Sequence, residues 1–422
     1  MIVGNADKEL KTDLSQLKYV FFTTNDNHLV RADYNKAVTA GGAMLSGLQQ
    51  GYAEALASAS GAVYFQDAMG FMYDWGKNAG SSTPLDWDQM RSDMMAALAA
   101  GDVSKIMPSY PFDRYLNDDG SLGIASYPLQ HGSLELEGLT RNYYYYVPSS
   151  YDGNAPVPLV FSFHGIHSSG NGQQSLAKLD ALAEKECFIV VYPDGQPLPE
   201  GVGILQEGSM IAGYQGLWNF TDAGINDMEF ISVLIDKLAG TDTEPGEFNI
   251  DRTRVYATGM SNGGIFSHKL AIELSHKIAA AACVTGPLAA ISTAKVPPRP
   301  VTVIQVSGNS DPVIDWNGNE TLGTISVDDT IAWWNKINQT SATPVVKEYP
   351  QVKPDDPTKV TKYIYSGGVN NTKVILYKID QMGHTWPMGP QYLPVPLIGN
   401  VCEQININEA IWEDLKEVRL PK

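Results

Sequence analysis

The chain has 422 residues, of which 43% are hydrophobic and 18% are charged. This composition is typical of a folded protein, and the length exceeds one ordinary hydrophobic core, so we expect two domains or one large domain with an appended region. The net charge is −18, from 29 Lys and Arg against 47 Asp and Glu, which disfavours nucleic acids and anionic membranes as partners.

The cysteines and the apolar runs exclude further classes of protein. Cys187, Cys283 and Cys402 are too few and too scattered for a disulfide framework or a zinc site, so we expect buried thiols and at most one bridge. No apolar run reaches the ~18 residues of a membrane span. We therefore predict no metal, no cofactor and no membrane-spanning segment.

The first 127 residues differ from the rest in amino-acid composition and in the spacing of their apolar residues. From Tyr34 to Leu98 they are rich in Ala, Met, Leu and Gly at helical spacing, which predicts helices. The segment from Phe112 to Gly132 is dense in turn-forming residues, as in a linker. We expect a mainly helical region over residues 1–127, acting as a lid or an accessory module, and a catalytic domain over residues 128–422.

From Gly132 onward, short apolar runs alternate with segments of helical periodicity. The stretch Gly132–Pro148 predicts a hairpin, and helices are expected over 174–186, 225–240 and 263–277. Such alternation indicates a mostly parallel sheet covered by helices on both faces. The apolar runs expected to form its strands are 158–165, 187–195, 253–261, 279–286, 300–311 and 373–384.

The run "RVYATGMSNGG" contains a candidate nucleophile. Ser261 lies in a G-x-S-x-G motif, after a β-branched and aromatic run and before an amphipathic one. A nucleophilic serine needs this strand–turn–helix context, because the flanking glycines let a sharp turn lift the hydroxyl above the sheet. We therefore predict that Ser261 is a nucleophile rather than an ordinary loop serine.

A serine nucleophile needs a base and an acid, which follow it along the chain in this arrangement. His384, in "DQMGHTWP", is the histidine downstream of the helix that follows Ser261, whereas His268 and His276 lie within that helix and are expected to pack or face solvent. Asp311 ends an apolar run between Ser261 and His384, and Asp315 is its nearest rival. Helix capping accounts for the other two acidic candidates, Asp328 and Asp329.

Acyl transfer also needs donors for the oxyanion, usually backbone N–H groups after the nucleophile and after an earlier strand. We predict the N–H groups of Asn262 and Ile166, the latter in "PLVFSFHGIHSSGNG". His164 and His167 have the spacing of a weak metal pair, but no carboxylate or cysteine nearby completes a site.

These motifs together give the chain a family resemblance. From about residue 130 onward it resembles the secreted polyhydroxybutyrate depolymerase and feruloyl esterase group of α/β-hydrolases, through "HG", "FIVVYPDG", "WN", "RVYATGMSNGG", "DPVIDWNG" and "GHTWP". The resemblance implies the α/β-hydrolase fold, a secreted or periplasmic location and a triad of Ser261, Asp311 and His384. The chain departs from the family pattern before the acid, where it has "SGNSD".

The resemblance and the loops near the strand ends narrow the function to ester hydrolysis through an acyl-enzyme. Trp218, Trp316 and Trp386 are expected at the substrate-binding edge of the sheet, where aromatic walls suit a phenolic acyl group or an apolar polyester. The expected partner is an ester substrate, possibly a polymer: feruloyl or acetyl esters of plant polysaccharide, or polyhydroxyalkanoate. A peptidase with the same triad and a non-catalytic binding protein remain as alternatives.

Overall fold

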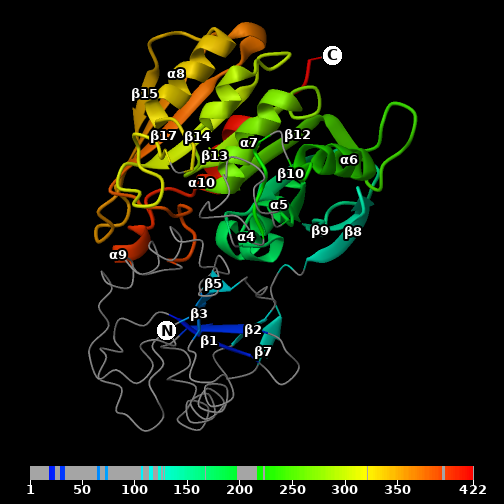
Figure 1. Ribbon diagram of the computed structural model, residues 1–422, viewed down its shortest axis with the longest axis horizontal. Coiled ribbons are helices and arrows are strands. Elements are labelled where there is room, and N and C mark those ends of the chain that lie inside the picture. The colour runs from blue at the N-terminus through cyan, green and yellow to red at the C-terminus, as the bar shows by residue number, and fades with distance from the viewer. Residues whose placement is uncertain are drawn as a thin grey trace.

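The structure of the chain is a computed structural model. It describes residues 127–421 except 128, 167, 197–215, 222–223, 321 and 392–394, and it describes seven short strands within residues 1–126. Figure 1 shows the whole chain.

The described residues of the N-terminal region form strands in two small sheets, with orders β1-β2-β6-β7 and β3-β4-β5. Two of these strands, β3 and β4, fall inside the stretch from Tyr34 to Leu98, so the helical expectation is wrong at those positions. The rest of that stretch lies outside the described residues, and the boundary after residue 127 stays a prediction. The strands are β1 (Tyr19–Thr23), β2 (Leu29–Asp33), β3 (Tyr64–Gln66), β4 (Met72–Asp74), β5 (Ile106–Met107), β6 (Arg114–Leu116) and β7 (Leu122–Ile124).

A ten-stranded sheet forms the centre of the remaining chain, in the order β15-β16-β17-β14-β13-β12-β10-β11-β9-β8. The six strands from β17 to β11 are parallel to one another, and an antiparallel pair flanks them on each side. The strands are β8 (Gln130–Leu136), β9 (Leu139–Tyr146), β10 (Val157–Phe163), β11 (Ile189–Pro193), β12 (Ile250–Met260), β13 (Ala280–Val284), β14 (Thr302–Gly308), β15 (Val345–Glu348), β16 (Lys359–Tyr365) and β17 (Val374–Asp380).

The six apolar runs of the sequence are these six parallel strands, and the expected hairpin is β8 and β9. Every residue of β10, β11, β13 and β14 is buried, because helices cover both faces of a parallel sheet. The mostly parallel sheet of the α/β-hydrolase fold is therefore confirmed.

Helices cover the sheet in two layers, which Figure 1 shows on either side of the strands. Helices α6, α7 and α8 pack against one face with Leu159 and Phe161 of β10, whereas α5 and α10 pack against the other face with Val160. The helices are α4 (Gly170–Ala177), α5 (Asp180–Glu186), α6 (Asp227–Ala239), α7 (Asn262–Glu273), α8 (Val327–Asn338), α9 (Val395–Ile398) and α10 (Ile407–Leu415), with 3₁₀ turns η3 (Ala290–Ala294) and η4 (Val369–Asn371).

Two helical expectations differ in detail from the structure. The single helix expected over 174–186 is broken into α4 and α5 at Lys178, which adopts a left-handed conformation with φ 51°. The first turn of α8 is capped by the Ser326 side chain, which accepts the N–H of Asp329, while Asp328 and Asp329 lie inside the helix. Asp328 and Asp329 therefore do not cap the helix. Their negative charges lie in the first turn, where they interact favourably with the positive end of the helix dipole.

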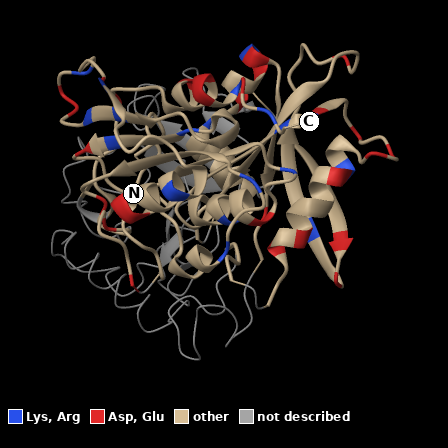
Figure 2. Cartoon of the chain, turned by 90° about the horizontal axis from the view of Figure 1, so that it is seen from above, with Lys and Arg blue, Asp and Glu red and all other residues tan. Residues whose placement is uncertain are grey.

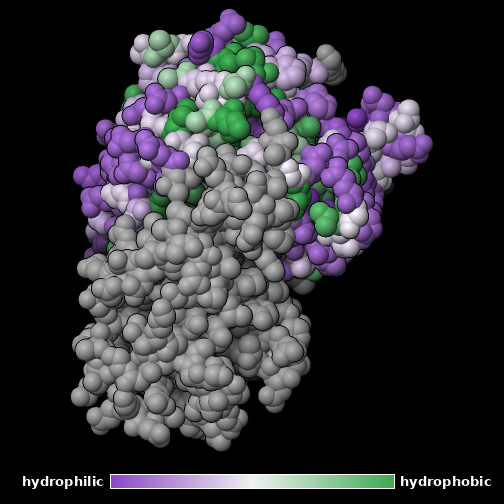
Figure 3. Space-filling view, viewed as in Figure 1, coloured by the Kyte–Doolittle hydropathy of each residue, from purple (hydrophilic) through white to green (hydrophobic). Residues whose placement is uncertain are grey.

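The described surface carries charges of both signs. Figure 2 shows Lys and Arg interspersed with Asp and Glu on the helices and loops around the sheet. On the face seen in Figure 3, hydrophobic residues lie in small groups between larger hydrophilic areas. In the part of the chain that the structure describes, no helix combines the length and the apolar character that crossing a membrane requires.

Candidate active site

Ser261 lies in a strained turn between β12 and α7. Its backbone has φ 57° and ψ −122°, a conformation that residues with a Cβ rarely adopt. Two hydrogen bonds hold it there: its N–H donates to the Val284 carbonyl at 2.9 Å, and its carbonyl accepts the Ile265 N–H at 2.9 Å. This is the geometry that a strand–nucleophile–helix turn requires.

The two glycines of the motif allow the turn to close. A Cβ on Gly259 would lie 2.6 Å from the Gly263 backbone, and a Cβ on Gly263 would lie 2.2 Å from the Phe163 carbonyl oxygen and 2.6 Å from that of His164. Neither contact can be relieved by a side-chain movement, because the neighbouring atoms are backbone. The start of α7 is therefore pressed against the end of β10, which leads into the loop of Ile166.

Asp311 and His384 are in direct contact. The Nδ1 atom of His384 lies 2.7 Å from Oδ2 of Asp311. Because an ionised carboxylate only accepts hydrogen bonds, Nδ1 carries the proton and donates it, which leaves Nε2 as the basic nitrogen. The other carboxylate oxygen, Oδ1, accepts the N–H groups of Val313 and Ile314 at 2.8 and 2.9 Å, so the acid is fixed from both sides.

The sheet order brings the three residues to one edge. Ser261, Asp311 and His384 follow the carboxyl ends of β12, β14 and β17, and these three strands are parallel with only β13 among them. All three residues are nearly buried, with 6%, 6% and 4% of their surface exposed. The rival Asp315 is exposed and accepts the N–H of Asn317 in a local turn instead.

His164 shapes the loop that carries Ile166. Its Nε2 accepts the Gly195 N–H at 2.9 Å, so Nδ1 carries the proton and donates to the Gly165 carbonyl at 2.6 Å. That carbonyl belongs to the same peptide unit as the Ile166 N–H, and in a trans peptide the two groups point in opposite directions. His164 therefore orients the predicted donor N–H of Ile166.

His164 is neutral in the folded protein. Its ring is fully buried, and burial lowers the pKa of His164 to about 4 because the charged form loses its hydration. Both of its ring nitrogens are occupied by backbone groups. His164 therefore serves as a structural residue of this loop and neither a base nor a metal ligand.

The turn after β11 holds the far end of the same loop. Oδ1 of Asp194 accepts the Gly170 N–H, at the first turn of α4, at 2.7 Å. Burial raises the pKa of Asp194 to about 6, and the Gly170 N–H together with the charges of His131 and Arg141 opposes this rise. Residues Asp194 and Gly195 thus fix both ends of the loop between β10 and α4. The motif "YPDG" was the sequence signal for this role, but sequence reasoning used it only as a family marker.

Asn262, the residue after the nucleophile, has a fixed side chain. Its Oδ1 accepts the Trp218 N–H at 2.6 Å, and its Nδ2 donates to the Trp218 carbonyl at 3.0 Å. The side chain is therefore occupied, and its contribution to a reaction comes from the backbone N–H. This N–H lies at the first residue of α7, where a helix leaves its N–H groups without intrahelical acceptors.

Two of the three tryptophans expected to contact substrate do not line an open site. Trp218 and Trp386 have no exposed surface, since both are packed into the core clusters on the two faces of the sheet. We correct the interpretation for these two residues. Trp316 is half-buried, with its indole N–H donating to Asp328 at 3.0 Å and Lys378 over its ring, and its contact with substrate stays a prediction.

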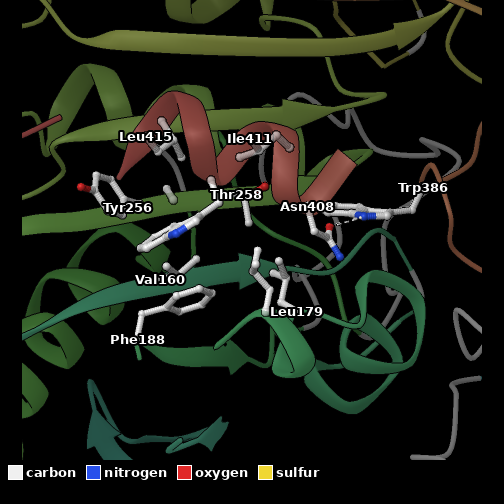
Figure 4. Close-up of a pocket in the computed structure, with 12 residues that line it drawn as sticks. Val160, Leu179, Phe188, Tyr256, Thr258, Trp386, Asn408, Ile411 and Leu415 are labelled. Atoms are coloured by element: carbon white, nitrogen blue, oxygen red, sulfur yellow. Dashed lines mark hydrogen bonds between the residues drawn. The ribbon is translucent and has the colours of Figure 1, made fainter. Parts of the chain in front are cut away.

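Trp386 connects the His384 loop to the C-terminal helix. Its indole N–H donates to Asn408 of α10 at 2.9 Å, and Asn408 in turn donates to the Ala177 carbonyl at the end of α4. Its ring borders an apolar cavity of about 20 Å³ beneath α10, which Figure 4 shows between Val160, Phe188 and Leu179. A space of this size holds at most one water molecule, so it is a packing defect and not a substrate site.

The other histidines and the cysteines have structural surroundings. His268 is buried, accepts the indole N–H of Trp334 at 3.1 Å and donates to Gln305, and burial lowers its pKa to about 4. His276 lies just beyond the end of α7 and is exposed. All three cysteines are free, and within the described residues no group of three His, Cys, Asp or Glu side chains is placed to hold a metal ion.

Part of the chain is similar to known esterases. It is 33% identical over 180 residues to the bifunctional acetylxylan esterase/xylanase XynS20E of Neocallimastix patriciarum, covering 43% of this chain and 23% of the relative. It is 28% identical over 178 residues to feruloyl esterase B of Piromyces equi, covering 40% of this chain and 29% of the relative. The chain thus spans about a quarter of the length of these two relatives.

The similarity extends to solved structures at low identity. A CE1 ferulic acid esterase from Anaeromyces mucronatus, in complex with ferulic acid, aligns at a TM-score of 0.37 and 14% identity, over 70% of this chain and 92% of that chain. No protein-family model matches the chain. The resemblance to feruloyl esterases that the motifs predict is confirmed by the named relatives.

Proposed function

We propose that the protein is a serine carboxylic-ester hydrolase that acts through an acyl-enzyme on feruloyl or acetyl esters of plant polysaccharide. The observation that supports it best is the combination of a serine in a strained turn with a buried His384–Asp311 pair on neighbouring parallel strands. A strained serine turn or a His–Asp pair alone has structural explanations. Their occurrence at one edge of one sheet favours nucleophilic catalysis.

In this proposal Ser261 attacks the ester carbonyl and His384 Nε2 takes its proton, while Asp311 holds the imidazole and stabilises its charged form. The N–H groups of Ile166 and Asn262 stabilise the oxyanion of the tetrahedral intermediate. His384 then protonates the departing alcohol, which leaves the acyl group on Ser261. Water, activated by the same imidazole, releases the acid and restores the serine.

The substrate class rests on the relatives, which are named as acetylxylan and feruloyl esterases. We propose the same class here, with a polymeric polysaccharide ester as the natural partner and secretion or a periplasmic location as the setting in which such a polymer is met. We propose that Trp316, which is half-buried and follows Asp311 by five residues, contacts a phenolic acyl group.

The test is hydrolysis of p-nitrophenyl acetate, p-nitrophenyl butyrate, methyl ferulate, acetylated xylan, polyhydroxybutyrate film and a peptide amide by the wild type and Ser261→Ala. We expect turnover of the small esters and of at least one polysaccharide ester, abolished by Ser261→Ala. Release of acid from polyester film alone would move the substrate class to polyesters, and cleavage of the amide alone would make the protein a peptidase. If the wild type hydrolyses none of these esters, the esterase proposal is wrong.

A further inference from the structure

Trp218 is hydrogen-bonded to both segments that carry the predicted oxyanion donors. Its main-chain N–H and C=O pair with the side chain of Asn262, at 2.6 and 3.0 Å. Its indole N–H donates to the carbonyl oxygen of His164 at 3.1 Å. One residue therefore bridges the first turn of α7 and the loop after β10.

The two segments meet at the same carbonyl that the indole binds. A Cβ on Gly263 would lie 2.6 Å from the His164 oxygen, so α7 already packs against this peptide unit. His164 itself orients the next peptide unit, which carries the Ile166 N–H. A change at the His164 carbonyl consequently moves the Ile166 donor relative to the Asn262 donor.

The indole ring is packed between aromatic side chains of β10 and α7. It stacks on Phe266 of α7 at 5.1 Å between centroids and meets Phe163 of β10 edge-on at 5.1 Å. The side chain has no exposed surface. Rigid burial between β10 and α7 makes Trp218 suited to set a distance between them.

The backbone next to Trp218 is anchored from outside the site. The Asn219 N–H donates to Oδ2 of Asp227 at 2.7 Å, and the other oxygen of Asp227 accepts Arg141, in an ion pair whose two side chains are each 1% exposed. Asn219 also donates from its side chain to the Ile225 carbonyl at 2.9 Å. This anchor fixes the backbone of residues 218 and 219 to β9 and α6.

We propose that Trp218 is a positioning residue that sets the spacing of the two oxyanion donors, Ile166 and Asn262. The inference rests on the proposed ester hydrolysis and deepens it. Trp218 touches no substrate, because it is buried, and it acts through the His164 carbonyl and the Asn262 side chain. The oxyanion forms only along the reaction path, so Trp218 is expected to affect kcat and leave KM unchanged.

The test compares Trp218→Phe with Trp334→Phe. Both substitutions remove one indole hydrogen bond and the same volume from the same core cluster, but the Trp334 indole binds His268 and not the His164 loop. The measurements are kcat and KM for p-nitrophenyl acetate, the inhibition constant of an alkyl trifluoromethyl ketone, which forms a tetrahedral adduct with a serine, and the melting temperature. The wild type and Ser261→Ala are assayed beside them.

We expect Trp218→Phe to lower kcat roughly tenfold or more, short of the 10²–10³ that follows loss of a whole donor. KM should stay within about twofold, and affinity for the trifluoromethyl ketone should fall by the same factor as kcat. Trp334→Phe should lower the melting temperature by a similar amount and leave kcat within about twofold of the wild type. If Trp218→Phe does not fold, β-(3-benzothienyl)alanine at position 218 replaces only the N–H by sulfur and takes its place in the comparison.

Three results overturn the inference. The first is equal kcat in the two variants, and the second is a Trp218→Phe effect confined to KM. The third is a fall in kcat without loss of affinity for the ketone. Absence of turnover in the wild type is a different result, because it refutes the proposed esterase activity itself.

Discussion

His384 Nδ1 lies 2.7 Å from Asp311 Oδ2, and each residue fixes the orientation of the other. The imidazole takes one carboxylate oxygen, and the N–H groups of Val313 and Ile314 take the other. The carboxylate therefore cannot rotate without breaking a hydrogen bond. Because the orientation of Asp311 is fixed, a substitution at this position gives a clear test of the proposed triad.

Asp311→Asn should lower kcat for p-nitrophenyl acetate by about 10³ to 10⁴. The asparagine oxygen can still accept from Val313 and Ile314, which turns its NH₂ group toward His384 and forces the proton onto Nε2. A base protonated at Nε2 cannot take the serine proton. The matched control is Asp315→Asn, an exposed acid four residues away, which should leave kcat within about twofold. Retention of more than a tenth of the wild-type kcat in Asp311→Asn would assign the acid elsewhere.

Ser261→Gly should be more stable than Ser261→Ala, although both lack the hydroxyl. Ala keeps a Cβ in a backbone conformation with φ 57° and ψ −122°, whereas Gly adopts it without strain. We expect the free energy of unfolding, measured with urea, to be about 1 kcal/mol higher for the glycine variant. At Ser267, inside α7, the same pair should show the opposite order by about 1 kcal/mol, because Gly disfavours a helix interior. Equal stabilities at position 261 would mean that the turn stores no strain.

Thr258→Val should stabilise the protein by about 1 kcal/mol. Thr258 lies in β12 and lines the apolar cavity beneath α10, and its buried hydroxyl has no hydrogen-bond partner among the described residues. Replacing it by a methyl group of similar size removes an uncompensated desolvation cost. Thr330 is the control, because its buried hydroxyl accepts the Leu288 N–H and donates to Ser326, so Thr330→Val should destabilise. Urea unfolding of both variants checks the two signs, and destabilisation by Thr258→Val would contradict the prediction.

Asp180→Asn should become increasingly stabilising as pH rises from about 4 to about 7. Burial raises the pKa of Asp180 to about 7, while the unfolded chain retains an ordinary carboxyl near 3.8. Between these values the folded state keeps a proton that the unfolded state has lost, so the contribution of Asp180 to stability is complete below about pH 4 and falls as pH rises. The slope approaches 1.4 kcal/mol per pH unit. The asparagine oxygen can still accept the Tyr192 hydroxyl, which lies 3.1 Å away.

The buried histidines make stability rise with pH, in the wild type and in Asp180→Asn alike. The cause is that the pKa values of His164 and His268 are lowered to about 4. Their neutral forms favour the folded state above about pH 6.5, and this contribution is lost as pH falls toward 4. The effect cancels in the difference between Asp180→Asn and the wild type. The measurement is therefore the difference in unfolding free energy at pH 4.5, 6 and 7.5. A difference that does not change with pH would place the Asp180 pKa near its ordinary value.

The parallel strands could be predicted from the sequence because burial on both faces leaves continuous apolar runs. The outer strand β15 could not, since all four of its residues are exposed and show no alternation. The break between α4 and α5 was missed for a similar reason, because Lys178 adopts the left-handed conformation without a glycine or proline to mark it.

At the site, the sequence pattern identified residues that follow the ends of strands. It could not show whether their side chains point into the core or toward the site. Asp311 and His384 were found because a triad prescribes their order, and the structure puts them in contact. Trp218 and Trp386 were expected in loops at the same edge of the sheet, but their rings are buried in the core. The indole N–H of Trp218 donates to a backbone carbonyl, and that of Trp386 donates to Asn408. Ser261's contact with His384, and the donor roles of Ile166 and Asn262, stay predictions that the variants above address.

The order of strands in the large sheet has a consequence for synthesis. Strand β17 comes after all the other described strands in the sequence, yet it lies inside the sheet between β14 and β16. A nascent chain that ends before residue 374 leaves β14 as a bare, apolar edge, with β15 and β16 already made but without the strand to which they attach. Such an intermediate exposes an apolar strand edge of the kind that favours aggregation, and it also lacks His384, the proposed base.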